Sequence, residues 1–163
     1  GGIVFKVDYS TRTAYVVADV DPMASTYAFA AASLAVTGIS VNTSANASFS
    51  DSNTAAIIST GLGAGVATPA ATWADGLTES GFDDWVLPTR DALLDIANNV
   101  WQLNIGTFIN TTNIPTTTYF WSSNDVGTAA SGVRVQFLAN LSVASNASKP
   151  NPLRALAIRT HQY

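Results

Sequence analysis

The stretch GFDDWVLPTRDALLDI, residues 81–96, constrains the fold more than any other part of this sequence. It joins an aromatic, acidic turn to the start of a helix. Thr89 follows Pro88 and is a good N-cap, because its hydroxyl can accept a hydrogen bond from a main-chain N–H of the first helical turn. Asp91 then lies in that first turn, where the helix dipole favours a negative charge. The sequence therefore predicts a helix that begins directly after Thr89.

The apolar residues that follow repeat at helical spacing and form one stripe, so the helix must pack against a core. The stripe consists of Leu93, Ile96, Ala97, Val100 and Trp101. Asn104 and Gly106 are expected to end the helix. Trp85 stands just before the helix start, and we expect it to be a buried anchor that fixes the turn.

The acidic residues of this stretch allow two interpretations. Asp83 and Asp84 are neighbours, and adjacent side chains in an extended turn point apart, which disfavours a shared metal ion or an acid–base pair. We expect carboxylates that accept main-chain N–H bonds instead. Asp91 and Asp95 are one helical turn apart and could hold a cation together, although a solvated helix face explains them as well.

Composition narrows the class of protein. The chain has 163 residues, of which 47% are apolar, and this suits one globular domain with a real core. Charged residues make up only 11%, well below the usual quarter. The surface is therefore expected to be polar but uncharged, as in many extracellular and virion proteins. The formal net charge is -4 and the basic residues are scattered, which argues against nucleic acid as a partner.

Catalytic side chains are scarce. The chain has no cysteine, which excludes disulfides, thiolate zinc sites and cysteine nucleophiles. Its single histidine, His161, stands near the end, and no serine lies in a nucleophile-elbow context that would make a Ser-His-Asp triad. We therefore expect no enzyme. The longest apolar run, residues 27–41, is shorter than the ~20 residues of a membrane span. The start at Gly1-Gly2 indicates processing or a domain cut from a longer protein.

Strand signals occur at both ends of the chain. Residues 2–7 and 13–18 are β-rich and read as a hairpin. The last third holds β-rich runs at 119–123 and 153–159, and between them Val133, Val135 and Phe137 alternate with polar residues. Residues 141–144 are a candidate hairpin partner for that alternating strand.

Helical signals lie between these strands. Residues 53–58 suggest a short helix, which Gly61, Gly63 and Gly65 are expected to break. Residues 68–77 can form a second helix with Pro69 at an early position. Strands at both ends with helices between them predict an α+β domain whose terminal strands pair.

Several motifs occur together in the order seen in a known family. They are GGIVFKVD at the start, NTAAI at 53–57, GFDDWVLPTRDALLDI, YFWSS at 119–123 and RALAIR at 154–159. In this combination the chain resembles the C-terminal domain of the collagen-like surface adhesin of Legionella. That family has the C-type-lectin-like fold, in the branch shared with formylglycine-generating enzymes. Related domains occur in bacterial surface proteins, phage tail proteins and diversity-generating retroelement targets.

The resemblance implies one domain over residues 1–163 with paired terminal strands, two main helices and a late β-rich ligand face. It does not imply catalysis, because the formylglycine-generating relatives need cysteines. Nor does it carry over calcium, since Trp121-Ser-Ser-Asn-Asp125 inserts two serines into the Trp-Asn-Asp tripeptide of sugar-binding C-type lectins. No cofactor is expected, and calcium is the alternative that the acidic residues leave open.

The segment from Trp121 to Asn151 is the candidate ligand site, because amide and hydroxyl side chains beside an aromatic ring can bind glycans or protein epitopes. Arg134 and Gln136 alternate with apolar neighbours and should face outward. A merely soluble polar edge is the other interpretation of the same residues. The predicted ligand-binding residues are Trp121, Ser123, Asn124, Asp125, Arg134, Gln136, Asn140, Ser142 and Asn146.

Two functions follow from the sequence. The first is a non-enzymatic recognition or adhesion domain, displayed on a phage tail or a bacterial surface, that binds a cell-surface glycan or protein. The alternative is a structural or decoration module of a virion, fibre or extracellular filament, which should bury an interface of ~1,200 Å² or more. Either would be extracellular, without membrane insertion, and either would act as a homo-oligomer or within a larger assembly.

Overall fold

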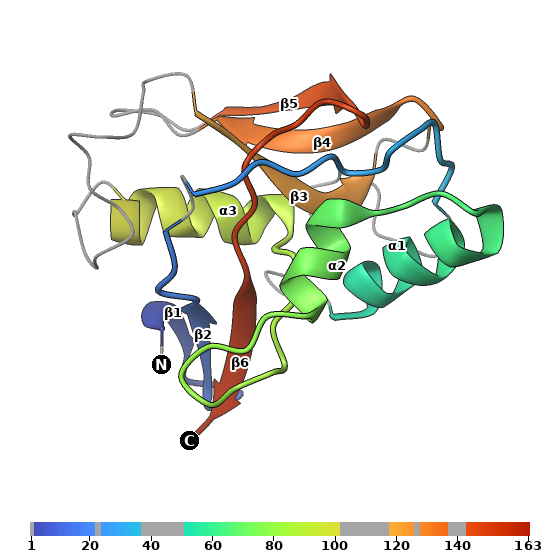
Figure 1. Cartoon of the computed structure of the whole chain (residues 1–163). Coiled ribbons are helices and arrows are strands. Elements are labelled where there is room, and N and C mark those ends of the chain that lie inside the picture. The colour runs from blue at the N-terminus through green and yellow to red at the C-terminus, as the bar shows by residue number, and fades with distance from the viewer. Residues whose placement is uncertain (1, 22–23, 37–50, 102–117, 126–127, 137–142) are drawn as a thin grey trace.

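The chain folds into an α+β arrangement of two three-stranded antiparallel sheets and three α-helices, within the residues that the structure describes. In this computed structural model the described residues are 2–21, 24–36, 51–101, 118–125, 128–136 and 143–163. Figure 1 shows the two sheets at opposite ends of the molecule, with the chain segment that leads into the last strand running from one to the other. The predicted α+β class is confirmed, with three helices in place of two.

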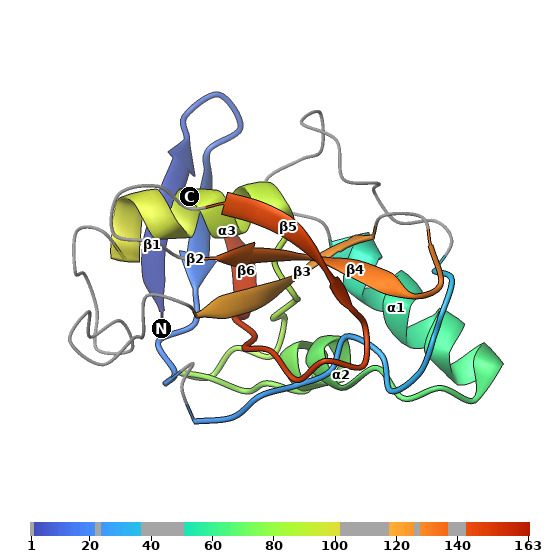
Figure 2. The ribbon, with the colours of Figure 1, turned by 90° about the horizontal axis from the view of Figure 1, so that it is seen from above.

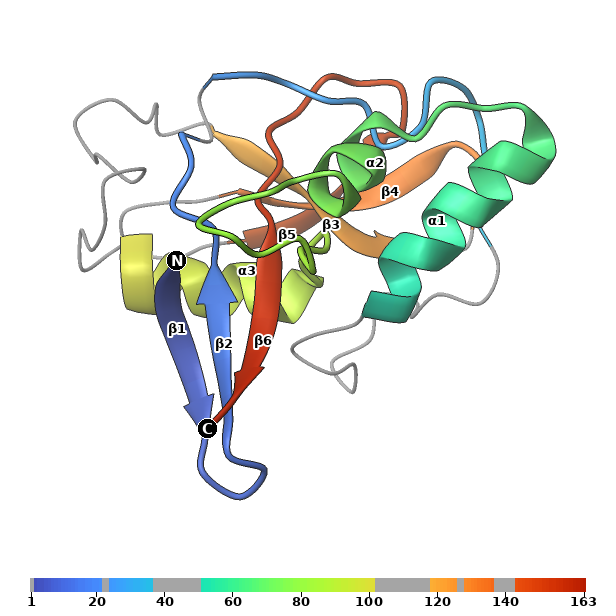
Figure 3. The ribbon, with the colours of Figure 1, turned by 60° about the horizontal axis from the view of Figure 1, so that its bottom comes forward.

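The terminal sheet contains β1 (Ile3–Asp8), β2 (Thr13–Val17) and β6 (Ile158–Gln162). Its order is β1-β2-β6, so the first and last strands share a sheet but do not pair directly, because β2 lies between them. The last strand also begins later than predicted, since Leu153 and Arg154 form isolated bridges and residues 155–157 belong to no strand. Figure 3 shows the three strands side by side, with the β1–β2 turn projecting from the molecule.

The late sheet contains β3 (Tyr119–Asp125), β4 (Ser131–Gln136) and β5 (Val143–Ser148), in the order β3-β4-β5. The predicted strands near 119–123 and 133–137 are both present. The expected hairpin partner at 141–144 is displaced toward the C-terminus, as β5.

The first two helices are α1 (Asp51–Ala64) and α2 (Pro69–Asp75). The prediction that the glycines break α1 early is wrong for Gly61 and Gly63, which lie inside the helix. Gly61 is small for a packing reason: a Cβ there would lie 2.6 Å from the Val66 carbonyl oxygen. Gly65 has φ +67° and follows the last helical residue, in the left-handed conformation that commonly ends a helix.

The third helix is α3 (Arg90–Ile96), which continues as a π-helical turn, η1 (Ala97–Trp101). Thr89 is the N-cap as predicted, and its hydroxyl accepts from the Ala92 N–H at 3.2 Å. The predicted end at residues 104–106 lies outside the described residues. In Figures 1 and 2, α3 lies on one side of the molecule and α1 with α2 on the other.

Two apolar clusters make up the core. One lies where α3 packs between the sheets, and includes Phe5, Leu93, Phe120 and Ile158. The other surrounds Trp85 and Trp121 and includes the alanine face of α2. Trp85 is 1% exposed, which confirms it as an anchor, and its indole N–H donates to the Phe82 carbonyl at 3.0 Å. No described helix has the length and apolar character needed to cross a bilayer.

Candidate functional site

The predicted ligand residues at the end of β3 lie in the interior. Trp121 and Ser123 are fully buried, and Asn124 and Asp125 are each 2% exposed. The prediction that these four residues contact a ligand is therefore wrong for this conformation of the chain. The indole N–H of Trp121 donates to the Tyr27 carbonyl at 2.9 Å, so even its polar edge is used inside the fold.

These buried polar groups join three elements. The Ser123 N–H donates to the Pro88 carbonyl at 2.7 Å, and the Asn124 side-chain oxygen accepts from the Arg90 N–H at 2.6 Å. The end of β3 thereby holds the main chain at the start of α3. We call the buried polar groups of Ser123 and Asn124, together with those of Asn53 and Thr54 of α1, the polar junction.

The first turn of α1 completes the polar junction. The Asn53 amide donates to the Ser123 hydroxyl at 3.3 Å, and the Thr54 hydroxyl accepts from the Leu87 N–H at 3.0 Å. Buried polar groups are costly when unpaired and rigidify a core when satisfied. The junction therefore explains why short amide and hydroxyl side chains are needed at these positions without any ligand.

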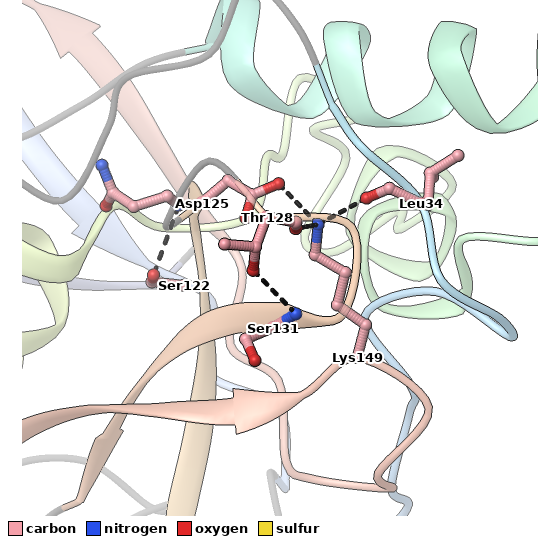
Figure 4. Close-up of polar contacts among 7 residues, drawn as sticks. Leu34, Ser122, Asp125, Thr128, Ser131 and Lys149 are labelled. Carbon is pink, nitrogen blue, oxygen red and sulfur yellow. Dashed lines mark hydrogen bonds and ion pairs between the residues drawn. The ribbon is translucent and has the colours of Figure 1, made fainter.

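Lys149, directly after β5, makes the second buried polar centre, which sequence reasoning missed. Figure 4 shows its ammonium group between Asp125, Thr128 and Leu34. Nζ donates to Asp125 Oδ2 at 2.6 Å and to the carbonyls of Leu34 and Thr128 at 2.5 and 2.9 Å. Three acceptors match the three N–H bonds of an ammonium, so the charge is fully satisfied although the side chain is 0% exposed. Nothing in the sequence distinguishes this lysine from a surface one.

The Asp83-Asp84 turn also serves the fold, and the main partner of Asp84 is a side chain rather than the predicted main-chain N–H. Asp84 forms a bidentate pair with Arg159 of β6, at 2.6 Å from Nε and 3.0 Å from Nη2. These bonds from Arg159 hold the pKa of the Asp84 carboxyl below its usual value, against a smaller opposing effect of partial burial. The guanidinium also lies 3.9 Å from the centre of the Phe82 ring. These contacts of Arg159 attach the Asp83-Asp84 turn to the terminal sheet.

The remaining predicted site residues lie on β4, on β5 or outside the described residues. Arg134 and Gln136 lie on β4, where the main-chain register places Arg134 between Trp121 and Ser145. Asn146 is exposed on β5. Asn140 and Ser142 lie outside the described residues.

Other candidate groups are separated in the fold. Asp91 pairs with Arg90, and Asp95 pairs with Lys6 at 3.2 Å, so the two acids of α3 have different partners. His161 is exposed on β6. Across the described ranges, no three acidic or histidine side chains come together in a way that could hold a metal ion.

Two surface hollows lie away from the predicted site. One has a volume of about 300 Å³ and lies along α1 and the start of α2, with Ile58, Leu62 and Val66 in its wall. The other has a volume of about 210 Å³ and contains two half-buried rings, Tyr27 and Trp73, which stack at 5.1 Å. The sequence feature that could have indicated this second hollow is Trp73 itself, a large aromatic residue beside the small alanines that α2 buries.

A comparison with solved structures finds a protein with a similar fold. A solved fimbrial protein from Bacteroides ovatus ATCC 8483 superposes with a TM-score of 0.54 at 10% sequence identity. The match covers 90% of this chain and 35% of that protein's chain, so this chain corresponds to a minor part of it. At this identity the likeness concerns the fold alone. No protein-family model matches the chain, and no curated protein does.

Proposed function

We propose that this chain is a non-enzymatic module of an extracellular filament or surface fibre. The observation that carries the proposal is the likeness of fold, over 90% of the chain, to a protein described as fimbrial. Because the chain spans 35% of that protein, the proposed role is that of one module within a larger subunit or assembly. The absence of cysteine and the low content of charge agree with a polar, catalytically inert surface protein.

The way the polar residues are used supports a structural role. Ser123, Asn124 and Asp125, which could have formed a ligand face, bond within the fold instead. Such a module contributes a rigid body whose outer surfaces contact neighbouring subunits. In this proposal residues 1–163 form a single domain.

The second candidate is a recognition domain of C-type-lectin-like fold, related to the Legionella collagen-like adhesin domain, on a phage tail or bacterial surface. It is favoured by the ordered sequence motifs. Two further features agree with it: Trp85 is buried beside the start of α3, and the first and last strands share one sheet. In this proposal the ligand is a cell-surface glycan or protein.

Immunogold electron microscopy with antibodies against the purified chain separates these roles on the cells or particles that produce it. A filament module predicts gold along the length of surface fibres. Gold confined to fibre or tail tips would favour the recognition domain. Gold restricted to the cell interior would contradict both.

A further inference from the structure

The hollow that contains Trp73 has the composition of a small-molecule site. Its walls combine the stacked rings of Tyr27 and Trp73 with aliphatic side chains, and Asp21 and Ser25 add a carboxylate and a hydroxyl near the rings. Ligand sites typically pair an apolar or aromatic wall with a few placed polar groups. The remaining lining residues are Val20, Ala24, Leu77 and Ala155.

Hydrogen bonds and packing on the side away from solvent fix the walls of this Trp73 hollow in place. The main chain of Tyr27 exchanges two hydrogen bonds with Leu153, at 2.7 and 3.0 Å, and its carbonyl also accepts from the Trp121 indole. Trp73 lies on α2, whose alanine face is fully buried. The next residue, Ala28, accepts from the N–H of Ala70, which ties the two walls together at 3.1 Å. Rings held in place in advance lower the entropic cost of binding.

The charge and size of the hollow select a class of ligand. Among the described residues that line it, Asp21 is the only charged one, and the chain carries a net charge of -4, so an anionic ligand is disfavoured. Arg154, which precedes the lining residue Ala155, donates to the Ser25 carbonyl at 3.1 Å and so supports the rim. The volume of about 210 Å³ is below the roughly 300–1,000 Å³ of pockets that enclose drug-sized molecules, so one ring fits rather than a chain.

We propose that the Trp73 hollow binds a single uncharged pyranose ring of a glycan. A pyranose offers an apolar C–H face to an aromatic ring, while its hydroxyls can donate to the Asp21 carboxylate and exchange hydrogen bonds with Ser25. The rest of the glycan leaves through the open mouth of the hollow. Repetition of the module along an assembly would compensate for weak binding at one ring. The proposal does not rest on the filament role, because a monomeric module would bind the same ring.

The test is a glycan array of neutral and acidic sugars, probed with the full chain displayed on beads. Saturation-transfer NMR with the methyl glycoside of any neutral sugar that binds then measures the variants. We expect Trp73→Ala to weaken binding about tenfold or more, because it removes a central aromatic anchor. Asp21→Asn, at an exposed position, should weaken binding severalfold, because it removes the carboxylate charge that accepts from the sugar hydroxyls.

Leu62→Ala, in the wall of the other hollow, is the matched control and should bind as the unmodified chain does. Circular dichroism confirms that each variant is folded. The proposal is overturned if no neutral glycan binds the displayed chain, or if only acidic glycans bind. It is equally overturned if Trp73→Ala and Asp21→Asn retain full binding.

Discussion

The two lysines of this chain form ion pairs in opposite environments. Lys6 reaches Asp95 at 3.2 Å, with side chains 37% and 34% exposed, near the ring of Tyr15. Lys149 reaches Asp125 at 2.6 Å, with side chains 0% and 2% exposed, near the ring of Phe29. The same chemical pair is therefore a screened surface contact in one place and an obligatory part of the core in the other. The difference shows that Asp125 and Lys149, two polar residues late in the sequence, serve the interior.

The largest effect should come from Lys149→Met, which leaves Asp125 buried without its counter-charge. Breaking one partner of a buried pair costs about 3–5 kcal/mol, and here two carbonyls lose their donor as well. Urea unfolding followed by circular dichroism measures the loss. A change below about 1 kcal/mol would contradict the obligatory role of this lysine.

Removing the charges of both Lys149 and Asp125 tests whether the uncompensated charge of Asp125 causes the loss of stability. The double variant Lys149→Met, Asp125→Leu has no uncompensated charge, and apolar replacements of a buried pair are often nearly neutral. The carbonyls of Leu34 and Thr128 still lose a donor, so we expect a net cost of about 1–3 kcal/mol, smaller than that of the single variant. A double variant less stable than Lys149→Met alone would argue against a charge-based explanation.

The Asp84–Arg159 pair should have an effect on stability between those of the two lysine pairs, because the Asp84 side chain is 55% exposed and the Arg159 side chain only 10%. Solvent screening limits its expected contribution to about 0.5–1 kcal/mol, measured as the loss in Asp84→Asn at neutral pH. Because the pKa of Asp84 is lowered in the folded chain, this stabilisation is present above the unfolded value of about 3.9. It is lost as pH falls through the lower folded value.

Unfolding of the unmodified chain and Asp84→Asn should therefore be compared from pH 7 to pH 3. The gap in stability should narrow only below about pH 4. A gap that stays constant across this range, or widens toward acid, would show that the carboxylate charge is not what matters.

The smallest effect should come from Lys6→Met. An exposed pair of this kind contributes about 0–0.5 kcal/mol, because water and salt screen it. The same urea unfolding serves as the measurement, repeated at low and high salt. A loss comparable to that of Lys149→Met would remove the contrast between the two lysines.

The sequence predicted well what local signals determine. Thr89 as an N-cap and the β1–β2 hairpin each depend on residues within one short stretch, whereas the burial of Trp85 was predicted from the apolar area of its large ring. The strand order was predicted less well, because the pairing of β2 with β6 joins residues far apart in the sequence. The extent of α1 was missed since Gly61 reads as a helix breaker, although it is required by the close approach of Val66.

The candidate site was mispredicted for a related reason. Serine, asparagine and aspartate in a row normally indicate a solvated surface, and only long-range partners reveal that Ser123–Asp125 are buried. Those partners come from α1, the start of α3 and the residue after β5, none of which is marked in the sequence. Burial of Lys149 cannot be recognised from local sequence, because lysine is almost never buried without such partners.

Amine labelling of the native chain tests the central claim most directly. An acetylating reagent followed by peptide mass mapping compares the two lysines in one sample, with the denatured chain as reference. The structure predicts that Lys6 is modified readily and that Lys149 stays unmodified until the chain unfolds. Labelling of Lys149 in the native chain at a rate similar to that of Lys6 would contradict a buried ammonium held by Asp125, Leu34 and Thr128.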